Sequence, residues 1–246
     1  MIDLNGKRAL VAGGSRGIGA AIALALAENG ADVAFTYQNS TEKAESVKGS
    51  IEAAGRRGVA IQADSGDPDA IARAVEEAVA ALGGLDILIN SAAIGYHGSV
   101  AELDVGEYQK LMDVNVRAPM LFAKAAIPHL HSGGRIVSIG SGLAERVPFP
   151  GVTAYAVSKA ALTSFTRGLS RELGPNGITV NLVQPGSTDT DANPASGDAA
   201  DFQRGMTSLG RYAEPREIAN AVVFLASPAA SVITGAVLNA DAGALA

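Results

Sequence analysis

Two side chains suited to proton transfer stand four residues apart in the segment Tyr155-Ala-Val-Ser-Lys159. The segment lies in a stretch, Val152 to Leu173, whose pattern predicts one helix. On a helix this spacing places both side chains on one face, about a turn apart. A phenol held beside an ammonium becomes an acid or base near neutral pH when its pKa falls from about 10 to about 8. The pair therefore indicates proton transfer at an oxygen atom.

A glycine-rich turn near the start of the chain is the second chemical feature, and it reads Ala12-Gly-Gly-Ser-Arg-Gly-Ile-Gly19. It follows an apolar run and opens an alanine-rich helix. In such a turn Gly13 permits the tight bend, Gly17 lets backbone approach a pyrophosphate, and Gly19 lets helix pack on strand. The free N–H groups of the helix then favour phosphate. A bare strand-to-helix turn is the alternative. Together with the phenol, the turn indicates a carbonyl/alcohol oxidoreductase that uses a dinucleotide.

The choice of dinucleotide depends on charge at the end of the second predicted strand. An NAD site places a carboxylate there, but Phe35 to Ser40 contains none. Arg16, inside the glycine turn, carries a guanidinium that can pair with a 2′-phosphate. We therefore predict NADPH rather than NADH, with Arg16, Asn39 and Ser40 as phosphate contacts and Tyr37 beside the adenosine. The alternative is that Arg16 is an exposed arginine without a specific role.

Composition excludes several other classes of protein. The 246 residues are 48% hydrophobic and carry a net charge of −6, which fits a large core and gives no surface for nucleic acid. The chain has no cysteine, and its three histidines are too scattered for a metal centre. No signal peptide or membrane-spanning run is present. We expect a soluble cytoplasmic protein with a small-molecule substrate and no nucleic-acid or membrane partner.

Strand and helix patterns alternate along nearly the whole chain. The predicted strands are apolar on both faces, as expected for a parallel sheet covered by helices on both sides; they are Arg8–Ala12, Asp32–Tyr37, Gly58–Gln62, Leu85–Asn90, Arg135–Ile139, Ile178–Val183 and Ala236–Asn239. The predicted helices are Gly17–Asn29, Thr41–Ala54, Pro68–Leu82, Gly106–Leu130, Val152–Leu173 and Pro215–Ala226. This order predicts an α/β class, single-domain, doubly wound Rossmann fold over residues 1–246, with a seven-stranded parallel sheet flanked by helices.

The least regular part of the chain runs from about 187 to 210 and follows the sixth predicted strand. Ligands of an open parallel sheet bind beyond the carboxyl ends of its strands. A long connection at that edge is therefore predicted to be a substrate lid. The alternative is a surface insertion without a role.

Several motifs occur in a characteristic order: the glycine turn, Asn90-Ser-Ala-Ala93, Asn115, Ser141, the Tyr155/Lys159 pair and Pro185-Gly186. With them the chain resembles the classical short-chain dehydrogenase/reductase (SDR) family over essentially its full length. Within that family it looks most like NADP-dependent carbonyl reductases of the 3-oxoacyl-carrier-protein reductase type. Its lid also resembles that of a bacterial relative linked to cyclic-di-GMP binding and biofilm dispersal.

The resemblance implies a role for each catalytic group. Tyr155 is the acid/base, Lys159 holds the nicotinamide ribose and lowers the tyrosine pKa, Ser141 orients the substrate oxygen, and Asn115 holds a water that links Lys159 to solvent. Two alternatives stay open: Ser138 is a rival to Ser141, and a helical asparagine such as Asn115 can simply satisfy nearby backbone.

The resemblance also implies the remaining binding residues and the assembly. The implied cofactor contacts are Gly13, Ser15, Arg16, Gly17, Ile18, Gly19, Tyr37, Asn39, Ser40, Asp64, Ser65, Asn90, Ala92, Tyr155, Lys159, Pro185, Gly186, Thr188 and Thr190. Family members are usually homotetramers built on two long helices and the last strand. The family's fourth-strand motif usually reads Asn-Asn-Ala-Gly, so Ser91 and Ala93 are departures, and neither removes a catalytic group.

A mostly apolar pocket mouth suits a ketone with hydrophobic substituents. The residues expected there are Ile94, Tyr96, His97, Leu143 and Val147, together with Phe149 and the lid to Met206. Arg146, Arg204 and Arg211 are candidates for an acidic or acyl-carrier partner. The first hypothesis is thus an NADPH-dependent carbonyl reductase that also works in the oxidative direction. The second is a regulatory protein that binds a cyclic dinucleotide on the same scaffold.

Overall fold

A seven-stranded, fully parallel β-sheet lies at the centre of the computed structural model, which describes residues 2–246. The strands are β1 (Arg8–Ala12), β2 (Asp32–Tyr37), β3 (Gly58–Gln62), β4 (Ile87–Asn90), β5 (Arg135–Ile139), β6 (Thr179–Pro185) and β7 (Val237–Ala240). Their order in the sheet is β3-β2-β1-β4-β5-β6-β7. The prediction of a doubly wound Rossmann fold with this sheet is confirmed.

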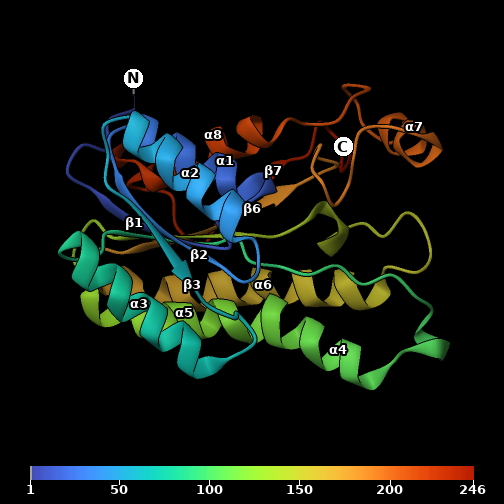
Figure 1. The fold of residues 1–246 in the computed structure, drawn as a ribbon. Helices are drawn as coiled ribbons and strands as arrows, with labels where there is room; N and C mark the ends of the chain where they lie inside the picture. The colour runs from blue at the N-terminus through green and yellow to red at the C-terminus, as the bar shows by residue number, and fades with distance from the viewer. Residues whose placement is uncertain (1) are drawn as a thin grey trace.

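Helices cover both faces of the sheet (Figure 1). One face carries α1 (Gly17–Glu28), α2 (Thr41–Ala53) and α8 (Pro215–Ala226), and the other carries α3 (Pro68–Leu82), α4 (Val105–Met112), α5 (Ala118–Ala126) and α6 (Thr153–Leu173). Each face has its own buried apolar cluster, which explains why the strands are apolar on both sides. Phe35 is the largest buried side chain under α1 and α2, and Phe122 of α5 lies in the opposite cluster.

The direction of winding reverses between β1 and β4, which lie side by side with Ala12 opposite Asn90. Crossovers run outward from β1 to β2 and β3 in one direction, and from β4 toward β7 in the other. The carboxyl ends of the two strands therefore leave a crevice between the connections that follow them, which is where an open α/β sheet binds its ligand.

One predicted helix is wrong in detail. The predicted single helix Gly106–Leu130 is α4, a π-helical turn at Asp113–Arg117, α5, and a short 3-10 turn at Ile127–His129. A π turn inserts an extra residue into the helical repeat, and the apolar spacing in the sequence did not reveal it. Pro128, within the 3-10 turn, has no N–H to continue the α-helical bonding.

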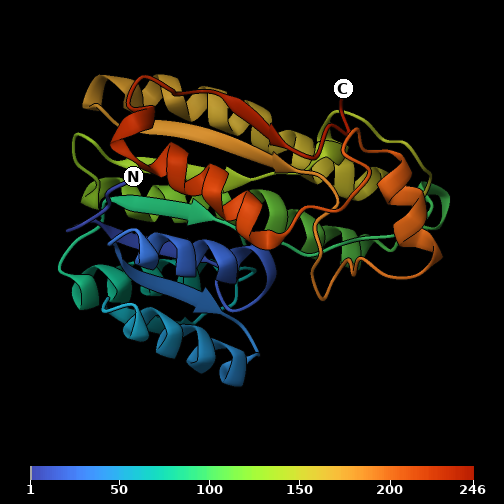
Figure 2. The ribbon, with the colours of Figure 1, turned by 90° about the horizontal axis from the view of Figure 1, so that it is seen from above.

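The irregular segment after β6 contains a helix that we did not predict, α7 (Asp198–Gly205). In Figure 2 the arrows of the strands point toward the side of the molecule on which α7 lies. The segment from about 187 to 210, called the lid below, is therefore at the carboxyl edge of the sheet, and its role as a substrate lid stays a prediction. Among residues 2–246, no helix has both the length and the apolar character needed to cross a bilayer.

Candidate active site

A cleft of about 1020 Å³ opens at the carboxyl edge of the sheet and receives side chains from every connection that follows a central strand. The predicted site residues that line it are Gly13, Ser15, Arg16, Gly17, Ile18, Gly19, Tyr37, Asp64, Ser65, Ala92, Ile94, Tyr96, His97, Ser141, Leu143, Tyr155, Lys159, Pro185, Gly186, Thr188 and Thr190. The glycine turn and the tyrosine–lysine pair, more than 130 positions apart in the chain, thus share one cavity.

Five predicted site residues do not line this cleft: Asn39, Ser40, Asn90, Asn115 and Val147. Asn39 is exposed, Ser40 stands at the start of α2, and Val147 is 50% exposed on the surface. Asn90 is buried and donates to the Ser138 hydroxyl at 3.3 Å. Residues of the cleft that the sequence did not single out include Gln38, Lys110 and Leu245.

Tyr155 and Lys159 extend from the first turns of α6. The Lys159 ammonium is buried and donates to the main-chain carbonyl of Ile139, at the end of β5, at 3.0 Å. Its Nζ lies 5.8 Å from the centre of the Tyr155 ring. The strand end therefore fixes the lysine, and the helix fixes the phenol relative to it.

The protein surroundings shift the pKa values of both groups toward the neutral form. Burial lowers the pKa of Lys159 to about 8 from 10.5. Burial also raises the pKa of Tyr155, while the hydroxyl of Ser141 acts in the opposite direction. Our expectation that the ammonium lowers the tyrosine pKa is therefore not met by the protein groups alone, because removal from water outweighs them.

Ser141 lies in the cleft and Ser138 does not. Ser141 follows β5 directly and begins a 3-10 turn, where its hydroxyl accepts the N–H of Leu143 at 3.2 Å. Ser138 is fully buried within β5 and bonded to Asn90. Of the two rivals, only Ser141 is placed to meet a ligand together with Tyr155.

Asn115 stands in the π turn and ties three parts of the site together. Its side-chain amide is 1% exposed, accepts the N–H of Ile94 and donates to the carbonyl of Ile94, both at 2.9 Å. It also donates at 3.0 Å to the Ser158 hydroxyl, which in turn donates to the Tyr155 carbonyl. Both amide hydrogens of Asn115 are thus already donated, and a water bound to this residue can bond only to the oxygen atoms of Asn115. The predicted water contact stays a prediction.

The turn that opens α1 has the properties of a dinucleotide cradle. Gly13 has φ +77°, and a Cβ on it would lie 2.7 Å from the Cα of Ala92. A Cβ on Gly19 would lie 2.0 Å from the Gly13 carbonyl oxygen, so helix and strand pack in contact here. No side chain caps α1, and its first turn has no acidic residue. The first N–H groups of the helix therefore remain as donors for a phosphate, and these residues fit a bound dinucleotide.

The wall of the cleft beyond β2 carries no carboxylate. Tyr37 and Gln38 line it, and the exposed Arg16 of the glycine turn lines the same cleft. This arrangement fits the predicted preference for a 2′-phosphate over a free 2′-hydroxyl.

Hydrogen bonds between side chains hold the lid in one shape. Gln203 of α7 exchanges two amide bonds with Asn193, each 3.1 Å long, and accepts the hydroxyl of Ser187 at 2.6 Å. The lid thereby connects the end of β6 with α7.

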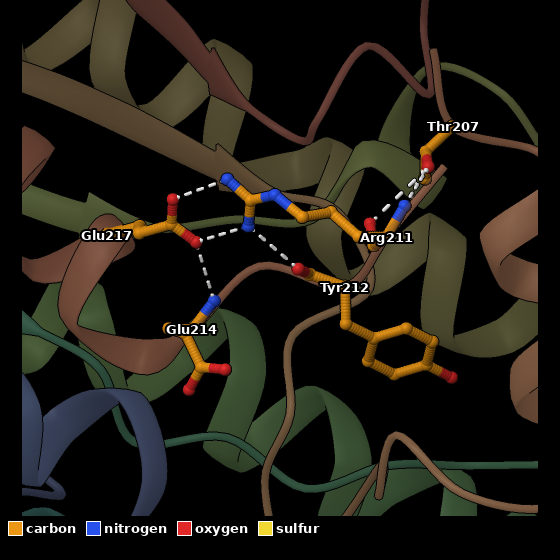
Figure 3. Close-up of polar contacts among 5 residues, drawn as sticks. All are labelled: Thr207, Arg211, Tyr212, Glu214 and Glu217. Atoms are coloured by element: carbon orange, nitrogen blue, oxygen red, sulfur yellow. Dashed lines mark hydrogen bonds and ion pairs between the residues drawn. The ribbon is translucent and has the colours of Figure 1, made fainter. Parts of the chain in front are cut away.

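The carboxyl end of the lid is fixed by Arg211 (Figure 3). Its guanidinium pairs with both oxygens of Glu217 at 2.7 Å and donates to the Tyr212 carbonyl at 2.9 Å. Glu217 also accepts the N–H of Glu214 in a capping box that starts α8. The Arg211 guanidinium and this backbone bond hold the pKa of Glu217 at about 2. This arginine is thus engaged within the chain, as are Arg146 and Arg204, which bond the carbonyls of Ala244 and Ala195.

Comparison with known proteins gives matches over nearly the whole chain. The sequence model of the family described as enoyl-(acyl carrier protein) reductase matches residues 12–244. The cyclic-di-GMP-binding biofilm dispersal mediator protein of Escherichia coli K12 is 42% identical over 236 residues, which is 96% of each chain. Versicolorin reductase stcU of Emericella nidulans is 39% identical, covering 98% of this chain and 96% of that protein.

Solved structures show the same likeness. A short chain dehydrogenase from Burkholderia cenocepacia J2315, in complex with NADP, superposes with a TM-score of 0.97 at 54% identity and covers 99% of each chain. A blue fluorescent protein from a metagenomic library, in complex with NADPH, gives 0.97 at 49% identity over 99% of this chain and 100% of that one.

Proposed function

The chain belongs to the classical short-chain dehydrogenase/reductase family, and from this we propose that it is an NADPH-dependent oxidoreductase that reversibly reduces a ketone to a secondary alcohol. One observation carries the proposal: Tyr155, Lys159 and Ser141 line the same cleft as the glycine turn. Structural neighbours in complex with NADP or NADPH support the choice of cofactor.

The glycine turn and Arg16 would hold the phosphates, and Lys159 the nicotinamide ribose. When bound, NADPH supplies the hydride that reduces the carbonyl carbon. Tyr155 donates its phenolic proton to the carbonyl oxygen, and in the oxidative direction it takes this proton back. Ser141 donates a hydrogen bond to the same oxygen and so aligns it with the phenol. Asn115 acts on these groups by holding Ile94 and Ser158, so it is a positioning residue.

The other end of the cleft is apolar and supports a ketone with a hydrophobic or aromatic substituent. Leu143, Val152 and Met206 line it together with Phe149. The ring of Phe149 meets Phe202 of α7 edge to face, with centroids 6.2 Å apart and planes at 71°. Phe149 lines the cleft and Phe202 does not, so Phe149 is the ring of this pair that a substrate in the cleft would contact.

The test is the oxidation of NADPH across a panel of aryl, alkyl and oxoacyl thioester ketones. We expect turnover with the apolar ketones, and its loss in Tyr155→Phe with NADPH binding largely kept. Tyr108→Phe is the matched control, since Tyr108 is outside the cleft on α4. Near-normal rates in Tyr155→Phe would overturn the assignment of the proton donor.

A second candidate function is binding of a cyclic dinucleotide. It is supported by the 42% identity with the Escherichia coli protein whose name includes cyclic-di-GMP binding. Calorimetry with cyclic di-GMP tests it, and turnover of a ketone without such binding would eliminate it.

We also propose a cytoplasmic homotetramer. Exposed apolar side chains on two helices of the same face of the sheet support the assembly: Met120 of α5 is 52% exposed and Val157 of α6 is 50% exposed. Light scattering tests the assembly, and a mass near one subunit would refute it.

A further inference from the structure

An ion pair crosses from the lid to α2. The ammonium of Lys43, in the first turn of α2, donates to the carboxylate of Asp191, which follows β6 in the lid. The two residues are 148 positions apart and belong to different connections of the sheet. Asp191 lines the cleft together with the glycine turn and the end of β2, whereas Lys43 is not among the lining residues and contacts Asp191 from α2.

The carboxylate of Asp191 lies beside the turn that is proposed to hold the phosphates. Asp191 lines the cleft, and its neighbour Thr190 lies against the glycine turn, since a Cβ on Gly17 would be 3.5 Å from the Thr190 methyl. The pKa of Asp191 is lowered by Lys43 first, and the charge of Arg16 contributes. One anionic side chain of the lid therefore faces two cations from two different elements.

The same cations are the ones available to a 2′-phosphate. In a doubly wound fold, the groups after the second strand select between a ribose 2′-hydroxyl and a 2′-phosphate. Lys43 is in the first turn of the helix that follows this strand, and Arg16 is in the facing turn. Because the side chains of Lys43 and Asp191 are 54% and 64% exposed, their ion pair is weak and can be exchanged for another.

We infer that Lys43 is a further ligand for the 2′-phosphate of NADPH, and that Asp191 competes with this phosphate for the lysine. The inference rests on the proposed function, and specifically on NADPH as the cofactor. It makes Lys43 a specificity residue that the motif pattern does not contain. The other explanation of the ion pair is a lid anchor that does not distinguish between dinucleotides.

The two explanations predict opposite effects of Asp191→Asn on NADPH binding. Under competition, Lys43→Met weakens NADPH binding about tenfold, because a charged bond to phosphate is lost. Asp191→Asn then tightens NADPH binding about threefold, because the competing anion is gone. NADH, which has no 2′-phosphate, binds both variants as it binds the original protein. An anchor instead predicts that both variants weaken both dinucleotides.

The experiment is a fluorescence titration of NADPH and NADH against the intact protein and four variants. The controls are Lys48→Met, on the same helix and paired only within it, and Asp201→Asn, in α7 and paired with Arg204. We expect neither control to change the NADPH-to-NADH ratio of dissociation constants. A repeat at 0.5 M NaCl adds a second readout, since screening reduces both effects.

Each outcome separates this inference from the proposed function. If the original protein binds NADPH but Asp191→Asn binds it more weakly or equally, competition is refuted and the carbonyl reductase proposal stands. If Lys43→Met keeps the original preference, Lys43 is not a phosphate ligand. If the original protein binds neither dinucleotide, the proposed function fails, and this inference fails with it. Absence of ketone turnover does not alter the binding result.

Discussion

The buried ammonium of Lys159 is expected to make the fold less stable than it would be without it. Burial lowers the pKa of Lys159 from 10.5 to about 8, and at about 1.36 kcal/mol per pH unit this corresponds to about 3 kcal/mol. A variant without this charge also loses the hydrogen bond to Ile139, which offsets about 1 kcal/mol of the gain in stability. Lys159→Met, which fills a similar volume, should therefore raise the free energy of unfolding at pH 7 by about 2 kcal/mol and abolish turnover.

The pH dependence carries the sharper test of this reasoning. The folded-state pKa is below the unfolded-state value, so between these two values the unfolded chain binds the extra proton and stability rises with pH. The penalty is fully present below pH 8 and is relieved as the pH rises from about 8 toward 10.5. The advantage of Lys159→Met should then shrink by about 1.4 kcal/mol per pH unit above pH 8 and disappear at about pH 9.5.

Urea unfolding followed by circular dichroism measures this difference at pH 7, 8, 9 and 10, at one protein concentration because an oligomer's stability depends on it. Lys48→Met is the matched control, since the Lys48 side chain is 36% exposed on α2. A constant difference between Lys159→Met and the original protein from pH 7 to 10 would refute the reasoning. So would a variant that is less stable at pH 7.

Three further predictions concern the scaffold of the site. Asn115→Ala leaves the partly or fully buried partners of its amide without bonds and should lower the free energy of unfolding by about 2 kcal/mol in urea; a loss below about 0.5 kcal/mol would contradict its role as a positioning residue. Gly19→Ala should weaken NADPH binding at least about tenfold in titrations, since its Cβ meets backbone at 2.0 Å, whereas Gly49→Ala has open space and should bind normally. Glu217→Gln should lower the melting temperature at pH 7 by about 2 °C, because Arg211 loses its partner. The pKa of Glu217 is lowered from its ordinary value of 4.5 to about 2, so the stability that its carboxylate contributes is lost as the pH falls from 4.5 toward 2. The difference in melting temperature should therefore vanish over this range. A difference that persists at pH 2 would exclude the ion pair as its cause.

The sheet was readable from the sequence because its strands are buried on both faces. A continuous apolar run such as Arg8–Ala12 has no competing interpretation as a surface element, and six of the seven predicted strands begin within one residue of the observed start, four of them at it. The prediction of one continuous helix at Gly106–Leu130 was wrong in the interior of that range. The extra residue of the π turn around Asn115 changes which side chains face inward without removing any apolar residue from the pattern.

Site residues that lie next to a predicted strand in the sequence could be predicted, whereas residues that reach the cleft from distant segments could not. The residues that directly follow a strand, such as Ser141 after β5 and the glycine turn after β1, could be placed from the strand pattern alone. Leu245 could not, because its approach to the cleft depends on how the last residues of the chain pack. The pairing of Lys43 with Asp191 belongs to this second group, since no local pattern connects two elements so far apart.

The lid contributes to both ends of the cleft, so the two ends are not independent. Asp191 lies at the charged end beside the glycine turn, while Met206 lines the apolar end. Between them Asn193 is bonded both ways to Gln203 on α7, so this stretch of the lid is cross-linked by side chains as well as by the chain. If Lys43 leaves the Asp191 carboxylate for a phosphate, the lid residues after Asp191 are no longer held to α2. The side-chain bonds between Asn193 and Gln203 then pass the resulting movement on to α7. The same ion pair that would set the preference for NADPH thereby also affects the surface that a ketone meets.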